Sequence, residues 1–202
     1  MKALVFGGAF NPPTKAHIEL PHHVMTELGY DCVIYVPSKM TYITDEQKKD
    51  YAFSDRTRIS MLDTIAQSQK WMKVSSYELR SESQPRTYTT LCYLRDQGYT
   101  CSLLFGSDKL PELETGWLHV DEIMKEFGVV CMRRADDPVE QWLEEDPYLS
   151  QYREYITLID TDPAFSRLSS TEVRNTLQAI HSEKERLKEI VPDELDGLSE
   201  YL

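Results

Sequence analysis

The chain of 202 residues lacks several features that would assign it to common classes of protein. No apolar run approaches the roughly 18 residues that a membrane-spanning helix requires. There are only four cysteines, with no C-x-x-C pair and no histidine at zinc-finger spacing, which argues against a zinc module or a disulfide scaffold. Three of them, Cys32, Cys101 and Cys131, lie in or beside apolar runs, where a thiol packs as a small hydrophobe. These observations predict a cytoplasmic protein.

Positive charge is scarce as well. Lys and Arg together number 22 against 34 Asp and Glu, so the net charge is −12. An acidic surface repels nucleic acids and anionic membranes, and we expect neither as a partner. The composition is 41% apolar and 10% aromatic, enough to build a core, which argues against intrinsic disorder.

Short apolar runs alternate along the chain with segments of helical spacing. The runs expected to form buried strands are 3–6, 32–36, 102–105, 128–132 and 155–159, with 74–79 as a weaker candidate. Between and after them, helical spacing occurs in 59–66, 91–94 and 173–180. Continuous apolar strands separated by helices predict an α/β fold, a Rossmann-like, doubly wound parallel sheet with helices on both faces.

The whole chain is expected to form one domain. Residues 183–202 alternate charged and apolar side chains, which predicts a helical tail packed on that domain. The polar segments 37–54 and 133–149 are interpreted as loops. In open α/β sheets such loops lie beyond the carboxyl ends of the strands, where ligands bind.

The first candidate site is the sequence Gly-Gly-Ala-Phe-Asn-Pro-Pro-Thr-Lys-Ala-His at positions 7–17. Two glycines directly after a strand let backbone N–H groups approach a phosphate. Thr14 is a candidate N-cap, which places His17 in the first helical turn, where an anion is favoured. The alternative interpretation is a tight turn followed by a surface histidine.

The second candidate site is Ser-Ser-Thr-Glu-Val-Arg at positions 169–174. Ser169 and Glu172 have the spacing of a capping box, which needs no functional explanation. Arg174, however, is a cation early in the helix, where the dipole favours negative charge. A bound polyphosphate would reverse that penalty by accepting hydrogen bonds from the guanidinium.

Together, the two segments resemble the G-G-x-F-[DN]-P-x-[HT]-x-x-H and S-S-T-x-x-R signatures of the nucleotidyltransferase superfamily. Finer features resemble the nicotinate or nicotinamide mononucleotide adenylyltransferases. These are Arg-Thr-Tyr-Thr-Thr-Leu at 86–91 and Phe-Gly-Ser-Asp at 105–108, followed by Trp117. The resemblance extends over essentially the whole chain.

The resemblance implies transfer of the adenylyl group of ATP to a pyridine mononucleotide in NAD biosynthesis, with release of pyrophosphate. It implies Mg²⁺ carried with ATP, no protein metal ligands, and a homo-oligomer as one arrangement. The residues expected to be catalytic are Thr14, His17 and Arg174. Those expected to bind ATP are Gly7, Gly8, Ala9, Phe10, Thr14, His17, Gly106, Asp108, Ser169, Ser170, Thr171 and Arg174. Those expected to bind the mononucleotide are Lys39, Tyr88, Thr89, Trp117 and Arg134.

Within these sets, the resemblance implies particular contacts. His17 would meet the α-phosphoryl group, whereas Ser170, Thr171 and Arg174 would hold the β- and γ-phosphates. Asp108 would accept hydrogen bonds from ribose hydroxyls, and Trp117 would stack on the pyridine ring. Backbone groups near Tyr88 and Thr89 would meet the carboxylate or amide of that ring.

The chain departs from the family pattern at three places. Ala16 stands where bacterial members have Gly, and Pro21 interrupts the first helix, which predicts a kink or a late start. Residues 37–40, Pro-Ser-Lys-Met, replace the Pro-Pro-His-Lys run of bacterial enzymes. Two alternatives therefore stay open: a phosphopantetheine adenylyltransferase and a non-catalytic nucleotide sensor of the same fold.

Overall fold

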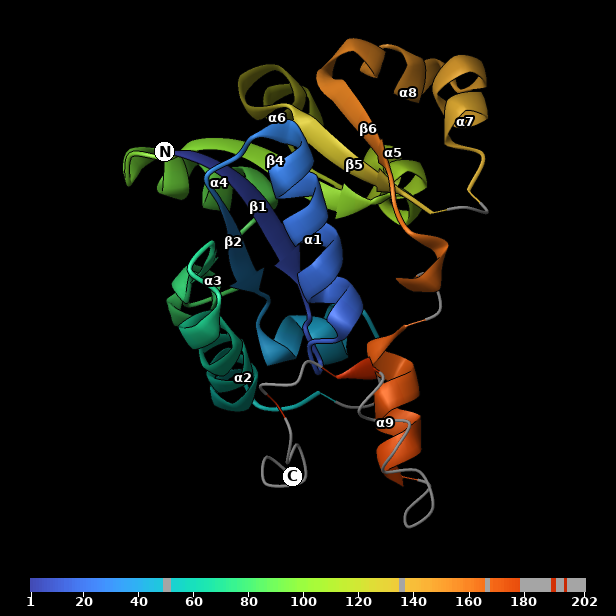
Figure 1. Cartoon of the computed structure of the whole chain (residues 1–202). Helices are drawn as coiled ribbons and strands as arrows, with labels where there is room; N and C mark the ends of the chain where they lie inside the picture. The colour runs from blue at the N-terminus through green and yellow to red at the C-terminus, as the bar shows by residue number, and fades with distance from the viewer. Residues whose placement is uncertain (49–51, 135–136, 166–167, 179–189, 192–194, 196–202) are drawn as a thin grey trace.

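The computed structural model describes residues 1–48, 52–134, 137–165, 168–178, 190, 191 and 195 (Figure 1). Its centre is one sheet of parallel strands in the order β3-β2-β1-β4-β5-β6. The strands are β1 (Lys2–Gly8), β2 (Cys32–Pro37), β3 (Met72–Val74), β4 (Thr100–Gly106), β5 (Val129–Arg133) and β6 (Ile156–Asp160). The strand order reverses between β1 and β4, so a crevice is expected beyond the carboxyl ends of these two strands.

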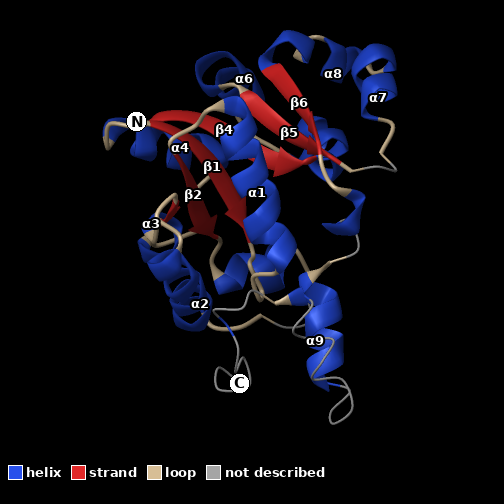
Figure 2. Ribbon diagram, in the orientation of Figure 1, coloured by secondary structure: helices blue, strands red, loops and turns tan. Residues whose placement is uncertain are grey.

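Successive side chains of the central strand point to opposite faces of the sheet, and helices cover both faces (Figure 2). Leu4 packs with α1 (Lys15–Leu28), α2 (Asp55–Ser68) and Val173 of α9 (Ser170–Gln178). Ala3 and Val5 pack with the helices of the other face. These are α4 (Thr87–Asp96), α5 (Leu113–Gly116), α6 (Val120–Phe127), α7 (Val139–Glu145) and α8 (Pro147–Ser150). The predicted Rossmann-like fold with helices on both faces is confirmed.

Three local predictions were wrong. The third strand ends at Val74, and the rest of the 74–79 candidate enters the short helix α3 (Tyr77–Arg80). The segment 133–149 contains α7, in which Val139 and Leu143 are buried four residues apart, and most of α8, which Asp146 caps and in which Leu149 is buried. The segment 37–54 also contains a helical turn, η1 (Tyr42–Glu46).

Pro21 lies inside α1, which starts at Lys15, so the late start is excluded. The expected tail at 183–202 lies outside the described residues, apart from Ile190, Val191 and Leu195, which are buried in the cluster that contains α1 and α2. Of the helices in the described ranges, none has the length and apolarity needed to cross a membrane.

Candidate active site

A cavity of about 200 Å³ lies at the carboxyl edge of the sheet. The ends of β1, β2 and β4 form one wall through Gly7, Gly8, Val36 and Phe105. The first turn of α4 and Trp117 line it from the other side. The cavity therefore occupies the crevice that the strand order predicts.

The segment 8–12, here called the phosphate loop, is held by donors to its backbone carbonyls. Ser38 N–H donates to Gly8 O at 2.9 Å and Arg58 Nη1 donates to Ala9 O at 2.7 Å. Arg174 Nη1 donates to Asn11 O at 2.6 Å and Ser170 Oγ donates to Pro12 O at 2.8 Å. The last two contacts bring together the two candidate sites of the sequence, which lie about 160 positions apart.

These contacts fix the direction of the loop amides. In a trans peptide the C=O of one residue and the N–H of the next point in opposite directions. Because the carbonyls of Gly8 and Ala9 face Ser38 and Arg58, the N–H groups of Ala9 and Phe10 point the other way. Successive N–H groups of this kind form a concavity that binds anions. Gly8 suits it sterically, since a Cβ there would lie 3.3 Å from the Phe10 ring.

His17 is positioned by the N-cap of α1. Thr14 is buried and has the extended conformation of an N-cap, as predicted. The backbone N–H of Thr14 donates to His17 Nδ1 at 3.1 Å, and Thr14 Oγ1 lies 2.7 Å from the same nitrogen. Since a backbone N–H only donates, Nδ1 accepts, and the neutral imidazole carries its proton on Nε2. The ring thus presents a donor at the helix N-terminus.

The N-terminus of α9 is capped by Ser169, whose Oγ accepts from Glu172 N–H at 3.1 Å. Arg174 extends back toward the phosphate loop, and its Nη2 donates to Thr171 Oγ1 at 3.0 Å. The donor-rich start of α9 therefore lies against the phosphate loop. Helix N-termini of this kind bind anions in proteins, and the binding of ATP phosphates here stays a prediction.

Asp108 follows β4 and is only partly buried. Its Oδ1 lies 3.2 Å from Arg134 Nη2, and its Oδ2 lies 3.7 Å from Lys109 Nζ. A Cβ at Gly106 would lie 2.7 Å from Asp108 Oδ1, so a larger residue there would displace the Asp108 carboxylate from this position. The structure thus brings three predicted residues together, namely Gly106, Asp108 and Arg134.

The start of α4 and Trp117 form the far end of the cavity. Trp117 lies partly exposed, with its ring edge-on to Phe105 at 5.8 Å between centroids. Thr89 is exposed in the first turn of α4, and Tyr88 directs its hydroxyl to Glu126 at 2.9 Å. The side chain of Tyr88 is therefore engaged elsewhere, whereas Arg86, Thr87 and Thr90 of the same segment line the cavity.

Lys39 has partners within the protein. Its Nζ donates to Leu79 O at 2.9 Å and Ser81 O at 2.7 Å, and its backbone N–H donates to Gln84 Oε1 at 2.8 Å. The ammonium group thus ties the loop after β2 to the end of α3. Binding of the mononucleotide by Lys39 stays a prediction, and it would require the ammonium to leave or share these carbonyls.

Two buried charged residues of the site were missed in the sequence. Glu78 lines the cavity and accepts from Thr90 Oγ1 at 2.7 Å and Gln84 Nε2 at 2.5 Å. Burial raises the pKa of the Glu78 carboxyl, and the two hydrogen bonds oppose that shift. The sequence did not mark Glu78, because it stands within the 74–79 segment that was interpreted as a weak strand candidate.

The other missed residue is Arg58, whose side chain is fully buried. Burial lowers the pKa of its guanidinium, an effect opposed by neighbouring Asp55. A signal for it exists in the sequence. Arg58 shares the helical spacing of the apolar residues Met61, Leu62 and Ile65, so it stands on the buried face of α2.

Comparison with known proteins finds relatives along nearly the whole chain. A probable nicotinate-nucleotide adenylyltransferase of Clostridium novyi (strain NT) is 25% identical over 193 residues, 94% of this chain and 91% of the relative. A nicotinamide/nicotinic acid mononucleotide adenylyltransferase of Oryza sativa subsp. japonica is 28% identical, covering 95% of this chain and 81% of the relative.

The fold has solved counterparts. The Plasmodium falciparum nicotinic acid mononucleotide adenylyltransferase complexed with APC superposes with a TM-score of 0.72 at 17% identity, covering 99% of this chain and 96% of that protein. The same enzyme complexed with NaAD gives 0.71 at 18% identity, covering 100% and 96%. At such identities the likeness establishes the fold. The family model described as cytidylyltransferase-like matches residues 5–176, and the chain therefore belongs to the cytidylyltransferase-like family.

Proposed function

We propose that the protein transfers the adenylyl group of ATP to nicotinate mononucleotide, forming the dinucleotide and releasing pyrophosphate. The observation that carries the proposal is the junction of the phosphate loop with α9, through Arg174 on Asn11 O and Ser170 on Pro12 O. This junction gathers anion-binding groups against the phosphate loop, whose Gly8 lines the cavity together with Trp117 and the start of α4. The curated relatives above carry names of the same activity.

The reaction follows from this arrangement. A phosphate oxygen of the mononucleotide attacks the α-phosphorus of ATP, and the bond from that phosphorus to the bridging oxygen of pyrophosphate breaks. Phosphoryl-type transfer needs mainly positioning and neutralisation of developing charge. His17 Nε2–H and the loop amides would donate to the α-phosphoryl oxygens, and Arg174 with the start of α9 would hold the departing pyrophosphate.

The start of α4 favours the acid over the amide. Arg86 and Thr87, the N-cap and first residue of a ten-residue helix, line the cavity, and both a guanidinium and a helix N-terminus favour a negatively charged group. Nicotinate carries a carboxylate where nicotinamide carries a neutral amide. We therefore place the pyridine carboxylate at this turn, with the ring against Trp117.

Mg²⁺ belongs to the substrate in this proposal, because it keeps much of its water and binds through phosphate oxygens. Within the described ranges, no three His, Cys, Asp or Glu side chains are grouped to hold an ion. In this proposal the cation enters with ATP. A cytoplasmic location, a homo-oligomer and the lack of a nucleic-acid partner remain predictions.

A substrate panel tests the function. The protein is incubated with Mg·ATP and, separately, nicotinate mononucleotide, nicotinamide mononucleotide and phosphopantetheine, and pyrophosphate is measured. We expect the highest kcat/KM with nicotinate mononucleotide. Turnover with phosphopantetheine alone would establish the first alternative, and ATP binding with no pyrophosphate from any acceptor would favour the nucleotide sensor.

A further inference from the structure

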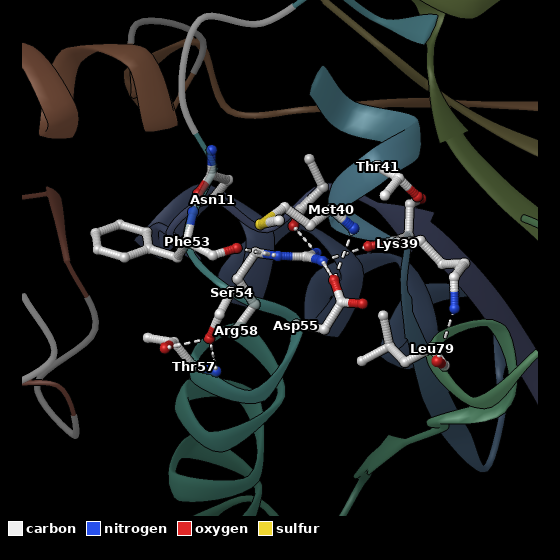
Figure 3. A network of polar contacts seen from close by, with 12 residues as sticks. Asn11, Lys39, Met40, Thr41, Phe53, Ser54, Asp55, Thr57, Arg58 and Leu79 are labelled. Atoms are coloured by element: carbon white, nitrogen blue, oxygen red, sulfur yellow. Dashed lines mark hydrogen bonds and ion pairs between the residues drawn. The ribbon is translucent and has the colours of Figure 1, made fainter. Parts of the chain in front are cut away.

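Arg58 is an internal connector among three segments at the carboxyl edge of the sheet (Figure 3). Its Nη1 donates to Ala9 O of the phosphate loop at 2.7 Å, and its Nη2 donates to Ser38 O after β2 at 2.5 Å. Its Nε donates to Phe53 O at 3.1 Å, just before α2. One planar guanidinium thus sets the positions of three backbone segments.

The partner carboxylate extends the same connection. Asp55 Oδ1 accepts from Arg58 Nη2 at 2.5 Å and from Met40 N–H at 2.6 Å (Figure 3). The pair therefore binds the turn after β2 on both sides, by the carbonyl of Ser38 and the amide of Met40. Phe53 N–H donates in turn to Asn11 Oδ1 at 2.8 Å, which joins the start of α2 to the phosphate loop a second time.

A contribution to folding stability is a weak explanation for a buried guanidinium at position 58. Burying a charged pair costs desolvation, and an apolar replacement of similar volume is often neutral or stabilising in proteins. An apolar side chain, however, would donate no hydrogen bonds to the carbonyls of Ala9 and Ser38. Without a donor, the Ala9 carbonyl loses the Arg58 hydrogen bond that helps fix the orientation of the peptide between Ala9 and Phe10, and the Phe10 amide belongs to the same peptide plane.

We infer that Arg58 is a positioning residue for the adenylyl transfer, which sets the phosphate loop and the turn after β2 at the spacing the two substrates require. The inference rests on the proposed function. Arg58 is buried beneath the loops, so it acts through the backbone of Ala9 and Ser38. Its loss should therefore lower kcat more than it changes the affinity for either substrate.

The primary test is Arg58→Lys, which keeps the charge and removes the planar fork. We expect kcat to fall by about tenfold to a hundredfold, the scale of a small misplacement of reacting groups. The KM values should change by less than kcat does. Arg56→Lys is the matched control, because Arg56 is an exposed residue on the same helix, and it should keep the wild-type kcat.

A second control separates positioning from general destabilisation. Ile65→Ala opens a cavity in the core packed by α2, seven residues along the helix from Arg58, and should lower the melting temperature without lowering kcat per folded molecule. In Arg58→Ala, millimolar ethylguanidinium should restore part of kcat, whereas ethylammonium, which carries the same charge without the fork, should not.

The outcomes separate the two proposals. If wild type forms the dinucleotide and Arg58→Lys matches Arg56→Lys, the positioning role is overturned while the function stands. An equal kcat loss in Ile65→Ala, or equal rescue by ethylammonium, would also overturn it. A wild-type chain that releases no pyrophosphate with any acceptor overturns the proposed function, and the positioning role with it.

Discussion

His17 has two roles, one in capping α1 and one proposed in catalysis, and different substitutions can separate them. Its Nδ1 accepts from the N–H of the N-cap Thr14, which supports the start of α1. Its Nε2–H is the donor proposed to meet the α-phosphoryl group. His17→Ala removes both, whereas His17→Glu replaces only the first. Glutamate at the third helical position completes a capping box with the N-cap threonine.

The magnitudes of the two losses differ. A net hydrogen bond to the backbone contributes about 0.5–1.5 kcal/mol to stability. Loss of one preorganised donor to a developing oxyanion costs about 10²–10³ in kcat. We therefore expect His17→Ala to lower the free energy of unfolding by about 1 kcal/mol and to lower kcat by at least about a hundredfold. His17→Glu should recover the stability, aided by a negative charge at the helix N-terminus, and show no recovery of kcat.

Denaturant unfolding and steady-state pyrophosphate release measure the two quantities on the same preparations. The role of His17 as a donor would be refuted by a folded His17→Glu protein with near-normal kcat. It would equally be refuted if the kcat loss in His17→Ala amounted only to its unfolded fraction. A stability of His17→Glu as low as that of His17→Ala would refute the capping assignment instead.

Much of the fold follows from local patterns in the sequence. Runs such as 32–36 are apolar on both faces, and only a parallel sheet covered by helices buries both faces of a strand. The third strand was misplaced because it is a three-residue edge strand, in which only Met72 is buried. Its apolar pattern is too short to distinguish it from the helix that follows.

The candidate site was predictable where function is carried by short segments. The phosphate loop was predicted from two glycines and the N-cap Thr14, and the start of α9 from a cation, Arg174, placed early in a helix. Their contact, Arg174 on Asn11 O, is tertiary and follows from no local pattern. The same holds for Arg58, whose acceptors lie in three separate segments. Its place on an apolar helix face marks it as buried but does not identify its partners.

The remaining predictions test Arg174 of α9 and two residues that line the cavity, Trp117 and Glu78. Arg174→Ala should weaken ATP binding about tenfold to a hundredfold and AMP binding much less, since AMP lacks the outer phosphates; parallel losses in calorimetric titrations would contradict this. Because Asn11 O loses a charged donor, the free energy of unfolding of Arg174→Ala without bound nucleotide should also be about 1 kcal/mol lower. Trp117→Ala should raise KM for the mononucleotide about fivefold with little change for ATP, as ring stacking contributes about 1 kcal/mol; equal weakening of both would indicate a purely structural tryptophan. The raised pKa of the buried Glu78 carboxyl predicts that the free energy of unfolding depends on pH. Because burial raises the pKa of its carboxyl in the folded protein above the ordinary 4.5, the folded state retains a proton that the unfolded chain has lost. The free energy of unfolding of wild type, relative to Glu78→Gln, should therefore decrease as the pH rises from 4.5 through the raised pKa and stay constant above it. Urea titrations of both proteins at successive pH values measure this difference, and a difference that rises with pH, or does not change, would contradict the assignment.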